Sequence, residues 1–161
     1  MVASGVATRM DIIAPAKWDQ QSCDHHYADK EKMLQLITHE LFHVYHGQLN
    51  ASPDFSDVNN IDWFVEGLAT YASGQCDSSR LSAIKKMVTA NKVPASLDKF
   101  WIGPMKYGLS GSVVLYIDQT YGRNKLKELL RFNSINQIMD ALGTSEADLI
   151  SHWKTYIERT I

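Results

Sequence analysis

The sequence predicts an α+β domain that is mainly helical, with a short β element at its N-terminus. Residues 5–14 are rich in β-branched side chains and partly alternate between polar and apolar, which is typical of a strand. After residue 30, segments of strong helix formers alternate with glycines and polar capping residues, which indicates a series of helices. No internal repeat, low-complexity tract or linker interrupts the 161 residues, so we expect one domain over residues 1–161.

The longest predicted helix covers residues 30–46 and follows a loop formed by Pro15 and the polar stretch 19–26. Asp29 stands at the N-cap position of this helix, and Gly47 follows its last expected residue. Apolar side chains cover most of the helix circumference. We therefore expect the helix to be buried at the centre of the domain.

The rest of the chain is predicted to form shorter helices. Residues 48–60 are rich in Asn, Ser and Asp, which is typical of a surface loop. The next helix is expected over residues 61–73, with Asn60 as its cap and Gly74 at its end. Further helices are predicted for residues 78–90, 111–121, 123–132, 134–142 and 145–160, with Gly108, Gly111, Gly122 and Gly143 as punctuation.

The composition excludes some functions. The chain is 45% hydrophobic and 21% charged, which is ordinary for a globular protein. A formal net charge of −2, without a cluster of Lys and Arg on one predicted face, argues against nucleic acid as a partner. No apolar run approaches the roughly 20 residues that a membrane span needs, and no signal peptide is visible.

One motif in the long helix carries chemistry. His39-Glu40-Leu41-Phe42-His43 is an H-E-x-x-H pattern, in which the two histidines lie about one helical turn apart and can bind the same ion. Glu40 is displaced by about 100° around the helix from His39, where it can reach a metal-bound water without being a ligand. A catalytic zinc ion usually has three protein ligands, so a third must come from elsewhere in the chain.

Glu66 is the candidate for the third ligand. It is a lone carboxylate among apolar residues of the second predicted helix, and an unpaired buried carboxylate costs several kcal/mol. A zinc ion would supply the compensating charge, and Gly67 would let two helix backbones approach closely. The alternative is that Glu66 is an exposed helix residue.

These two motifs carry a resemblance to a known family. The pairing of residues 39–43 with Trp63-Phe64-Val65-Glu66-Gly67-Leu68-Ala69 resembles the gluzincin metallopeptidases. It is most similar to the peptidase-MA-like families and to the catalytic domain of aminopeptidase-N-like enzymes, whose second motif reads W-x-x-E-G-x-A. Residues 107–113 resemble the segment with the family's catalytic tyrosine, and the tail resembles the helical pairs that follow it. The resemblance covers roughly residues 30–160.

The resemblance implies a gluzincin-like (zincin) catalytic domain that hydrolyses peptide bonds of a peptide or protein substrate. It implies that Glu40 is the general base acting on a zinc-activated water, and that Tyr107 stabilises the oxyanion, with Tyr71 as the next candidate. It also implies one zinc ion, held by His39, His43 and Glu66.

The chain departs from the family in three places. The aminopeptidase G-x-M-E-N strand is absent; Asp11 could take the place of its glutamate, and endopeptidase or exopeptidase action stays undecided. Thr70 stands where thermolysin-like relatives have an aspartate that contacts a histidine ligand. The chain before the zinc helix is short, so it is either a minimal catalytic domain or part of a larger protein.

Several other side chains remain open in their roles. His46 shares the face of its helix that carries His39 and His43, so it is a candidate for contacting a metal ligand or lining the cleft. The alternative for His46 is a partly exposed histidine at the helix end. Thr70 and Tyr71 are also candidates for contacting a ligand. Cys23 and Cys76 form either one disulfide or two thiols, and a disulfide would favour an extracytoplasmic location. Oligomeric state stays open. Two loop histidines at the cleft rim and three packing anchors complete the candidates: His25, His26, Trp18, Trp101 and Trp153.

Two other functions remain as alternatives. One is a zinc-binding interaction module of the same fold that has lost catalysis, and the other is a gluzincin-like hydrolase of a non-peptide substrate. The presence of Glu40 argues against the first, because a structural zinc site is normally closed by a fourth protein ligand and needs no base.

Overall fold

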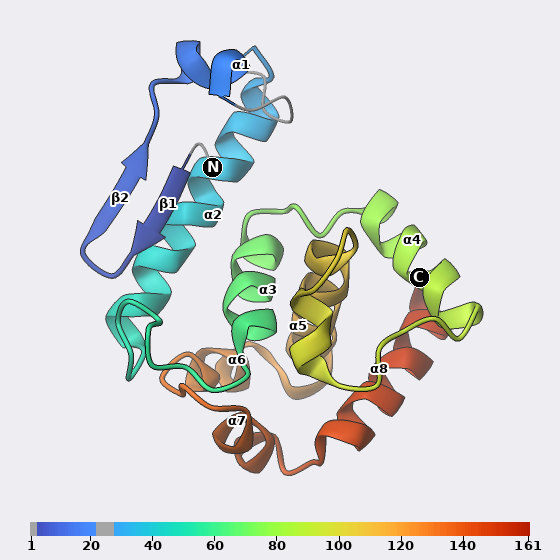
Figure 1. Cartoon of the computed structure of the whole chain (residues 1–161). Helices are drawn as coiled ribbons and strands as arrows, with labels where there is room; N and C mark the ends of the chain where they lie inside the picture. The colour runs from blue at the N-terminus through green and yellow to red at the C-terminus, as the bar shows by residue number, and fades with distance from the viewer. Residues whose placement is uncertain (1–2, 22–27) are drawn as a thin grey trace.

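A hairpin and a long helix stand beside a body of shorter helices (Figure 1). The computed structural model describes residues 3–21 and 28–161. Within these ranges the protein is mainly helical with one two-stranded sheet, which confirms the expected α+β class. No described helix combines the length and the apolar character that crossing a membrane requires.

The N-terminal β element is a hairpin rather than the single strand expected over residues 5–14. β1 (Ala3–Val6) pairs antiparallel with β2 (Arg9–Ile12), in a register that places Ala3 opposite Ile12 and Val6 opposite Arg9. A turn at residues 7 and 8 separates the strands, and Ala-Thr lacks the glycine or asparagine that usually announces such a turn.

Two short helical segments follow where a loop was predicted. They are the 3-10 helix η1 (Pro15–Lys17) and the helix α1 (Trp18–Gln21). Pro15 fits the first position of a helical turn, because its missing N–H would have no partner there. Trp18 is buried against Ala3 and Leu36, so this small cluster ties the hairpin to the next helix.

α2 (Lys30–Leu49) is the long helix predicted for residues 30–46. Its start is confirmed, because the Asp29 side chain accepts a hydrogen bond from the Lys32 N–H. Its end lies beyond Gly47, which was expected to terminate it. A Cβ at Gly47 would overlap the carbonyl oxygen of Pro53, so this glycine admits a neighbouring loop instead of ending the helix.

α3 (Asp62–Ala72) matches the second predicted helix, but its cap differs. Ile61 occupies the N-cap and makes no side-chain capping bond. Asn60 has a φ of 57°, and its carbonyl accepts a hydrogen bond from the indole of Trp63. Gly74, with a φ of +75°, follows the end of the helix as predicted.

The remaining helices form the body around α3. α5 begins before residue 111, where the helix was predicted to start, and both Gly108 and Gly111 lie inside it. Gly108 packs closely against Ile84, and Gly111 packs closely against Thr70. These two glycines therefore allow close packing against neighbouring helices and do not mark chain turns. The elements in order are α4 (Ser78–Thr89), the 3-10 helix η2 (Leu97–Trp101), α5 (Lys106–Tyr121), α6 (Arg123–Leu129), α7 (Ile135–Leu142) and α8 (Glu146–Thr160).

The core lies around α3 and α5, which run side by side (Figure 1). The prediction that residues 30–46 form the central buried helix is wrong. Leu34, Leu41 and Tyr45 of α2 are 64%, 49% and 46% exposed. The helix instead buries the face that contains its histidines, because that face packs against β1 and α3.

Candidate metal centre

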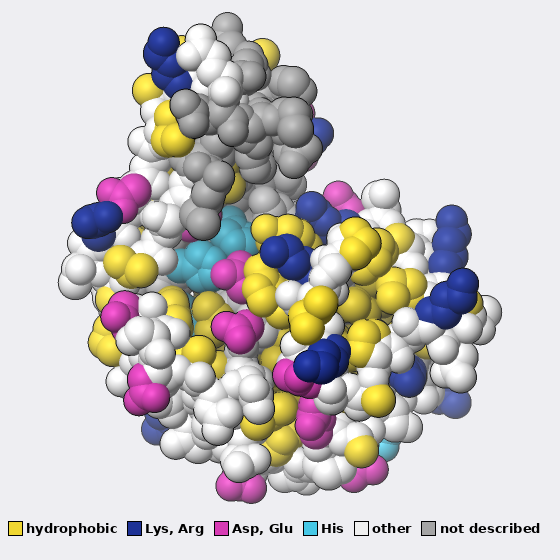
Figure 2. Space-filling model, in the orientation of Figure 1, with side chains coloured by type: hydrophobic (Ala, Val, Ile, Leu, Met, Phe, Trp, Pro, Cys, Tyr) yellow, Lys and Arg dark blue, Asp and Glu magenta, His cyan; other side chains and the backbone are white. Residues whose placement is uncertain are grey.

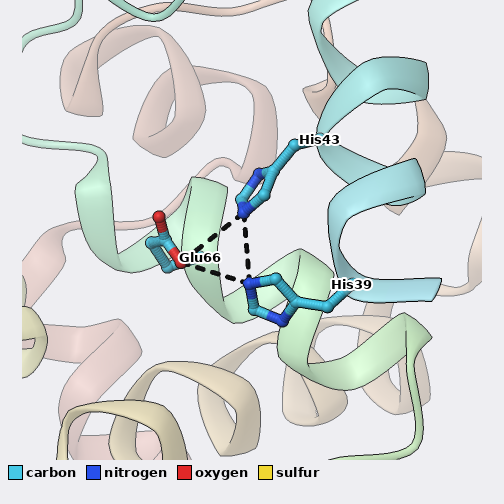
Figure 3. Close-up of side chains that lie close together, drawn as sticks. All are labelled: His39, His43 and Glu66. Carbon is cyan, nitrogen blue, oxygen red and sulfur yellow. Dashed lines mark hydrogen bonds and ion pairs between the residues drawn. The ribbon is translucent and has the colours of Figure 1, made fainter. Parts of the chain in front are cut away.

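Two side chains of α2, four residues apart, meet a third side chain from α3. The Nε2 atoms of His39 and His43 lie 3.2 Å apart, and Oε2 of Glu66 lies 3.4 Å from the first and 3.6 Å from the second. Figure 3 shows both imidazole rings on α2 turned toward the carboxylate on α3. The three ligand atoms lie within 4.8 Å of one another, close enough to bind one metal ion.

Glycines allow the elements around this cluster to approach so closely. A Cβ on Gly67, next to Glu66, would lie 2.6 Å from the backbone oxygen of Ser110 in α5. A Cβ on Gly5 of β1 would overlap the backbone carbonyl of Glu40. The close helix approach expected at Gly67 is therefore present, but its partner is α5 rather than the histidine helix.

The charges of the cluster favour an ionised carboxylate. Burial acts to raise the pKa of Glu66, but hydrogen bonds and positive charge from His39 and His43 outweigh it and lower this pKa to about 2. Glu66 is thus an anion throughout the physiological pH range. An anionic oxygen beside two imidazole nitrogens is a donor set suited to a divalent cation.

Glu40 lines the same cavity as His39, His43 and Glu66 but does not belong to the group that could hold a metal ion. Its side chain is buried, and burial raises its pKa, while the nearby histidines and a backbone hydrogen bond from Gly5 act in the opposite direction. A carboxylate whose pKa is raised toward neutrality is better suited to accept and return a proton.

A cavity of about 480 Å³ opens beside the cluster. In Figure 2, histidine side chains reach the surface in a hollow, with acidic side chains next to them. β1 forms one wall, so the N-terminal β element borders the cleft. Outside α2, the polar and aromatic residues that line the cavity include Asp54, Asp62, Glu66, Trp101 and Tyr107.

Tyr107 lies in this cavity, in the first turn of α5. Its ring centroid is 6.3 Å from that of His39, and the side chain is partly exposed. Burial and the negative charges of Glu66 and Glu40 raise the pKa of its hydroxyl. The hydroxyl therefore stays protonated and can donate a hydrogen bond.

Tyr71, the other tyrosine candidate, lies elsewhere. Its hydroxyl donates to Oδ2 of Asp118 at 2.6 Å, and Arg123 forms an ion pair with the same carboxylate. Tyr71 lines a separate small pocket between α2, α3 and α6. Its hydroxyl is committed to this network, so the structure does not place Tyr71 beside the metal ligands.

Within the described residues, the other two candidates for contacting the cluster, His46 and Thr70, make no hydrogen bond to His39, His43 or Glu66. His46 is fully buried, which corrects the alternative of a partly exposed helix end; its Nε2 donates to the carbonyl of Leu130. Thr70 is fully buried too, and within the described residues its hydroxyl has no hydrogen-bond partner.

Gln75 is a residue near the cluster that the sequence did not indicate. Its side-chain Oε1 lies 3.0 Å from Nδ1 of His39. No local pattern announces this contact, because Gln75 follows the helix end and lies 36 residues from His39. Asp62 could have been found, since it precedes Glu66 by four residues and so shares its helix face.

Some predictions fall outside the cleft or outside the described residues. Asp11 pairs with Arg9 on β2 and does not line the cavity. Trp18 and Trp153 are buried as expected, whereas Trp101 lies on the cavity wall. Cys76 is half-buried beside Gly111. Cys23, His25 and His26 lie outside the described residues, and so does the Cys23–Cys76 pairing.

Comparison with known proteins returns no relative. No protein-family profile matches the chain, and no curated protein or solved structure resembles it significantly.

Proposed function

We propose that this protein is a zinc-dependent metallopeptidase with a gluzincin-like catalytic domain. The observation that supports this most directly is the convergence of His39, His43 and Glu66 in one cavity with a buried carboxylate, Glu40, beside them. The sequence resemblance points to the same roles for these residues.

The spacing of the three ligand atoms fits zinc. Ligands at 2.0–2.1 Å in a tetrahedral arrangement lie about 3.4 Å from one another. The three separations in the cluster are 3.2, 3.4 and 3.6 Å. Among the described residues the cluster contains three donors, which leaves one tetrahedral position for water or substrate, as in catalytic rather than structural zinc sites.

The side chains around the cluster divide the work of amide hydrolysis. A bound zinc ion supplies Lewis acidity that activates water and polarises a carbonyl group. Glu40 accepts the proton of the attacking water and returns it to the leaving amine. The Tyr107 hydroxyl donates a hydrogen bond to the oxygen on which negative charge develops, a contribution of about 3 kcal/mol in comparable oxyanion sites.

The wall formed by β1 favours a peptide as the substrate. One edge of β1 pairs with β2, and its other edge has no strand partner within residues 3–21 and 28–161. The same strand lines the cavity. The Gly5 N–H of this strand is bonded to Glu40, and an extended peptide can pair with the remaining backbone groups of the edge. Such pairing would position a scissile bond without requiring a particular side chain.

The proposal is tested by measuring zinc content and peptide cleavage in the same set of variants. The wild type is expected to bind one zinc ion and to cleave members of a quenched peptide library. Glu66→Gln should weaken zinc binding by at least about 100-fold, since it removes an anionic ligand. Glu40→Gln should keep the metal and lose cleavage by about 100-fold or more. Glu31→Gln, an exposed glutamate on α2, is the matched control.

Each outcome separates the candidate functions. Absence of zinc binding in the wild type would reject the proposal. Stoichiometric zinc that depends on Glu66, without cleavage of any library member, would favour the inactive binding module or a hydrolase of a non-peptide substrate. Equal cleavage by wild type and Glu40→Gln would remove Glu40 from the mechanism.

A further inference from the structure

We propose that Gln75 is a positioning residue for the metal centre, whose side-chain oxygen holds His39 in the tautomer that directs a free Nε2 lone pair toward the metal. This inference rests on the metal site of the proposed function and adds a residue that neither sequence motif contains.

The contact that carries the inference is a hydrogen bond to the far side of the His39 ring. Nδ1 of His39 and Oε1 of Gln75 are 3.0 Å apart. With Oε1 facing the ring, Nδ1 carries the proton, because a carbonyl oxygen only accepts. Nε2 of a neutral ring is then free of a proton, whereas a doubly protonated ring also donates from Nε2 to Glu66. That Nε2 is the atom that faces Glu66 and His43.

The chain is arranged to bring Gln75 to this position. α3 ends at Ala72, and Gly74 adopts a left-handed conformation, which turns the chain back toward α2. Nε2 of Gln35 on α2 donates to the Gly74 carbonyl at 3.5 Å. The Arg80 guanidinium on α4 donates to the backbone carbonyl of Gln75. Contacts from two other helices therefore hold the segment in place.

The two histidines differ in the hydrogen bonding of their Nδ1 atoms. Nδ1 of His43 is buried and, among the described residues, has no hydrogen-bond partner. Thr70 stands where the thermolysin-like enzymes have an aspartate, and its hydroxyl also has no hydrogen-bond partner within residues 3–21 and 28–161. The orienting contact at this centre thus comes from the segment after α3, and it acts on His39.

An amide in this role differs physically from the usual carboxylate. It is neutral, so it raises the basicity of the ligand less than a carboxylate would. It can also rotate to present its NH₂ group to Nδ1, which would move the ring proton to Nε2 and block metal binding. A carboxylate can only accept, so Gln75→Glu should secure the metal-binding tautomer and strengthen zinc affinity.

The test has two measurements on wild type, Gln75→Leu, Gln75→Glu and Gln35→Ala. Long-range ¹H–¹⁵N NMR of the metal-stripped protein at about pH 9, where a free imidazole is neutral, reports the His39 tautomer. Zinc affinity is measured by competition with a chelator. Gln35→Ala is the matched control, because Gln35 anchors the same segment without contacting His39.

We expect the Nδ1–H tautomer in wild type, Gln75→Glu and Gln35→Ala, and a shift toward Nε2–H in Gln75→Leu. Zinc affinity should fall about 10- to 100-fold in Gln75→Leu, the range for residues that orient a ligand. It should equal or exceed the wild-type value in Gln75→Glu and change less than about 3-fold in Gln35→Ala.

The outcomes distinguish this inference from the proposed function. An Nε2–H tautomer in wild type, or a tautomer that Gln75→Leu leaves unchanged, would overturn the role of Gln75. Equal loss of affinity in Gln35→Ala and Gln75→Leu would reduce Gln75 to a loop anchor and overturn it as well. The expected tautomers in a protein that binds no zinc would reject the metal centre while keeping the orienting contact.

Discussion

The two helices that carry the candidate ligands bury opposite kinds of surface. α3 buries an apolar face, with Trp63, Phe64 and Leu68 all inaccessible to solvent or nearly so. α2 buries His39 and His43 and leaves large apolar side chains such as Leu41 on the outside. α3 therefore turns its apolar residues toward the core, as amphipathic helices usually do. α2 instead turns polar histidines inward and leaves several of its large apolar residues exposed.

The two helices therefore make different contributions to the free energy of folding. α3 packs along α5 and contributes apolar burial to the core. α2 contributes polar groups whose burial costs free energy unless a partner or a cation compensates it. The two candidate ligands of α2 are thus turned inward, and this orientation leaves apolar residues of the same helix exposed.

The largest expected difference comes from one substitution made on each helix. Leu68 of α3 is 1% exposed and Leu41 of α2 is 49% exposed. Leu68→Ala should lower the free energy of unfolding by about 3–4 kcal/mol, because it leaves a cavity in the core. Leu41→Ala should change it by no more than about 0.5 kcal/mol. Urea unfolding of the metal-stripped proteins measures both, and similar losses would show that α2 is packed as α3 is.

The next effect concerns His46, the most deeply buried histidine of the α2 face. Burial, followed by the nearby charge of His43, lowers its pKa from 6.5 to about 4. The folded protein thus keeps His46 neutral while the unfolded chain takes up a proton, so stability should fall as pH drops from about 6.5 to 4. The gap corresponds to roughly 3 kcal/mol in total.

Comparison with His46→Gln isolates this effect. The amide can still donate to the Leu130 carbonyl but does not titrate. Unfolding of both proteins at a series of pH values, with a chelator present, should give a shallower decline for the variant over this window. Parallel profiles would show that His46 does not contribute to the acid sensitivity.

The smallest effect tests the glycine that lets α3 pack against α5. Gly67→Ala gains helix propensity but places a methyl group 2.6 Å from the fixed backbone oxygen of Ser110. We expect a net loss of about 2 kcal/mol. At Gly108 the nearest atoms, at 3.0 and 3.1 Å, belong to the Ile84 side chain, which can shift more readily than a backbone oxygen, so Gly108→Ala should cost less than Gly67→Ala. Thermal or urea unfolding decides, and an equal response would show that α3 and α5 can separate slightly.

Local signals predicted several helix boundaries and the three side chains that lie close enough to bind a metal ion. Asp29 begins α2 and Gly74 follows α3 as expected. The spacing of His39 and His43 placed both rings on one helix face, and Glu66 lies beside them. These predictions succeed because helix caps and helix periodicity depend on residues within a few positions of one another.

Predictions that required knowledge of neighbouring elements failed. Gly47, Gly108 and Gly111 were interpreted as helix ends but lie inside helices, where they admit a loop or another helix. A glycine has the same sequence signature in both uses, and only the partner that packs against it distinguishes them. The hairpin turn at residues 7 and 8 lacked any turn signal.

By itself the sequence determined the helical character of the chain, the short β element and the residues that can bind a metal, because these depend on local spacing and chemistry. The tertiary structure decided which face of α2 is buried, that Tyr107 rather than Tyr71 lines the cavity, and that Gln75 reaches His39. Each of these depends on which distant segments pack together, and packing is a property of the whole chain rather than of any stretch of it.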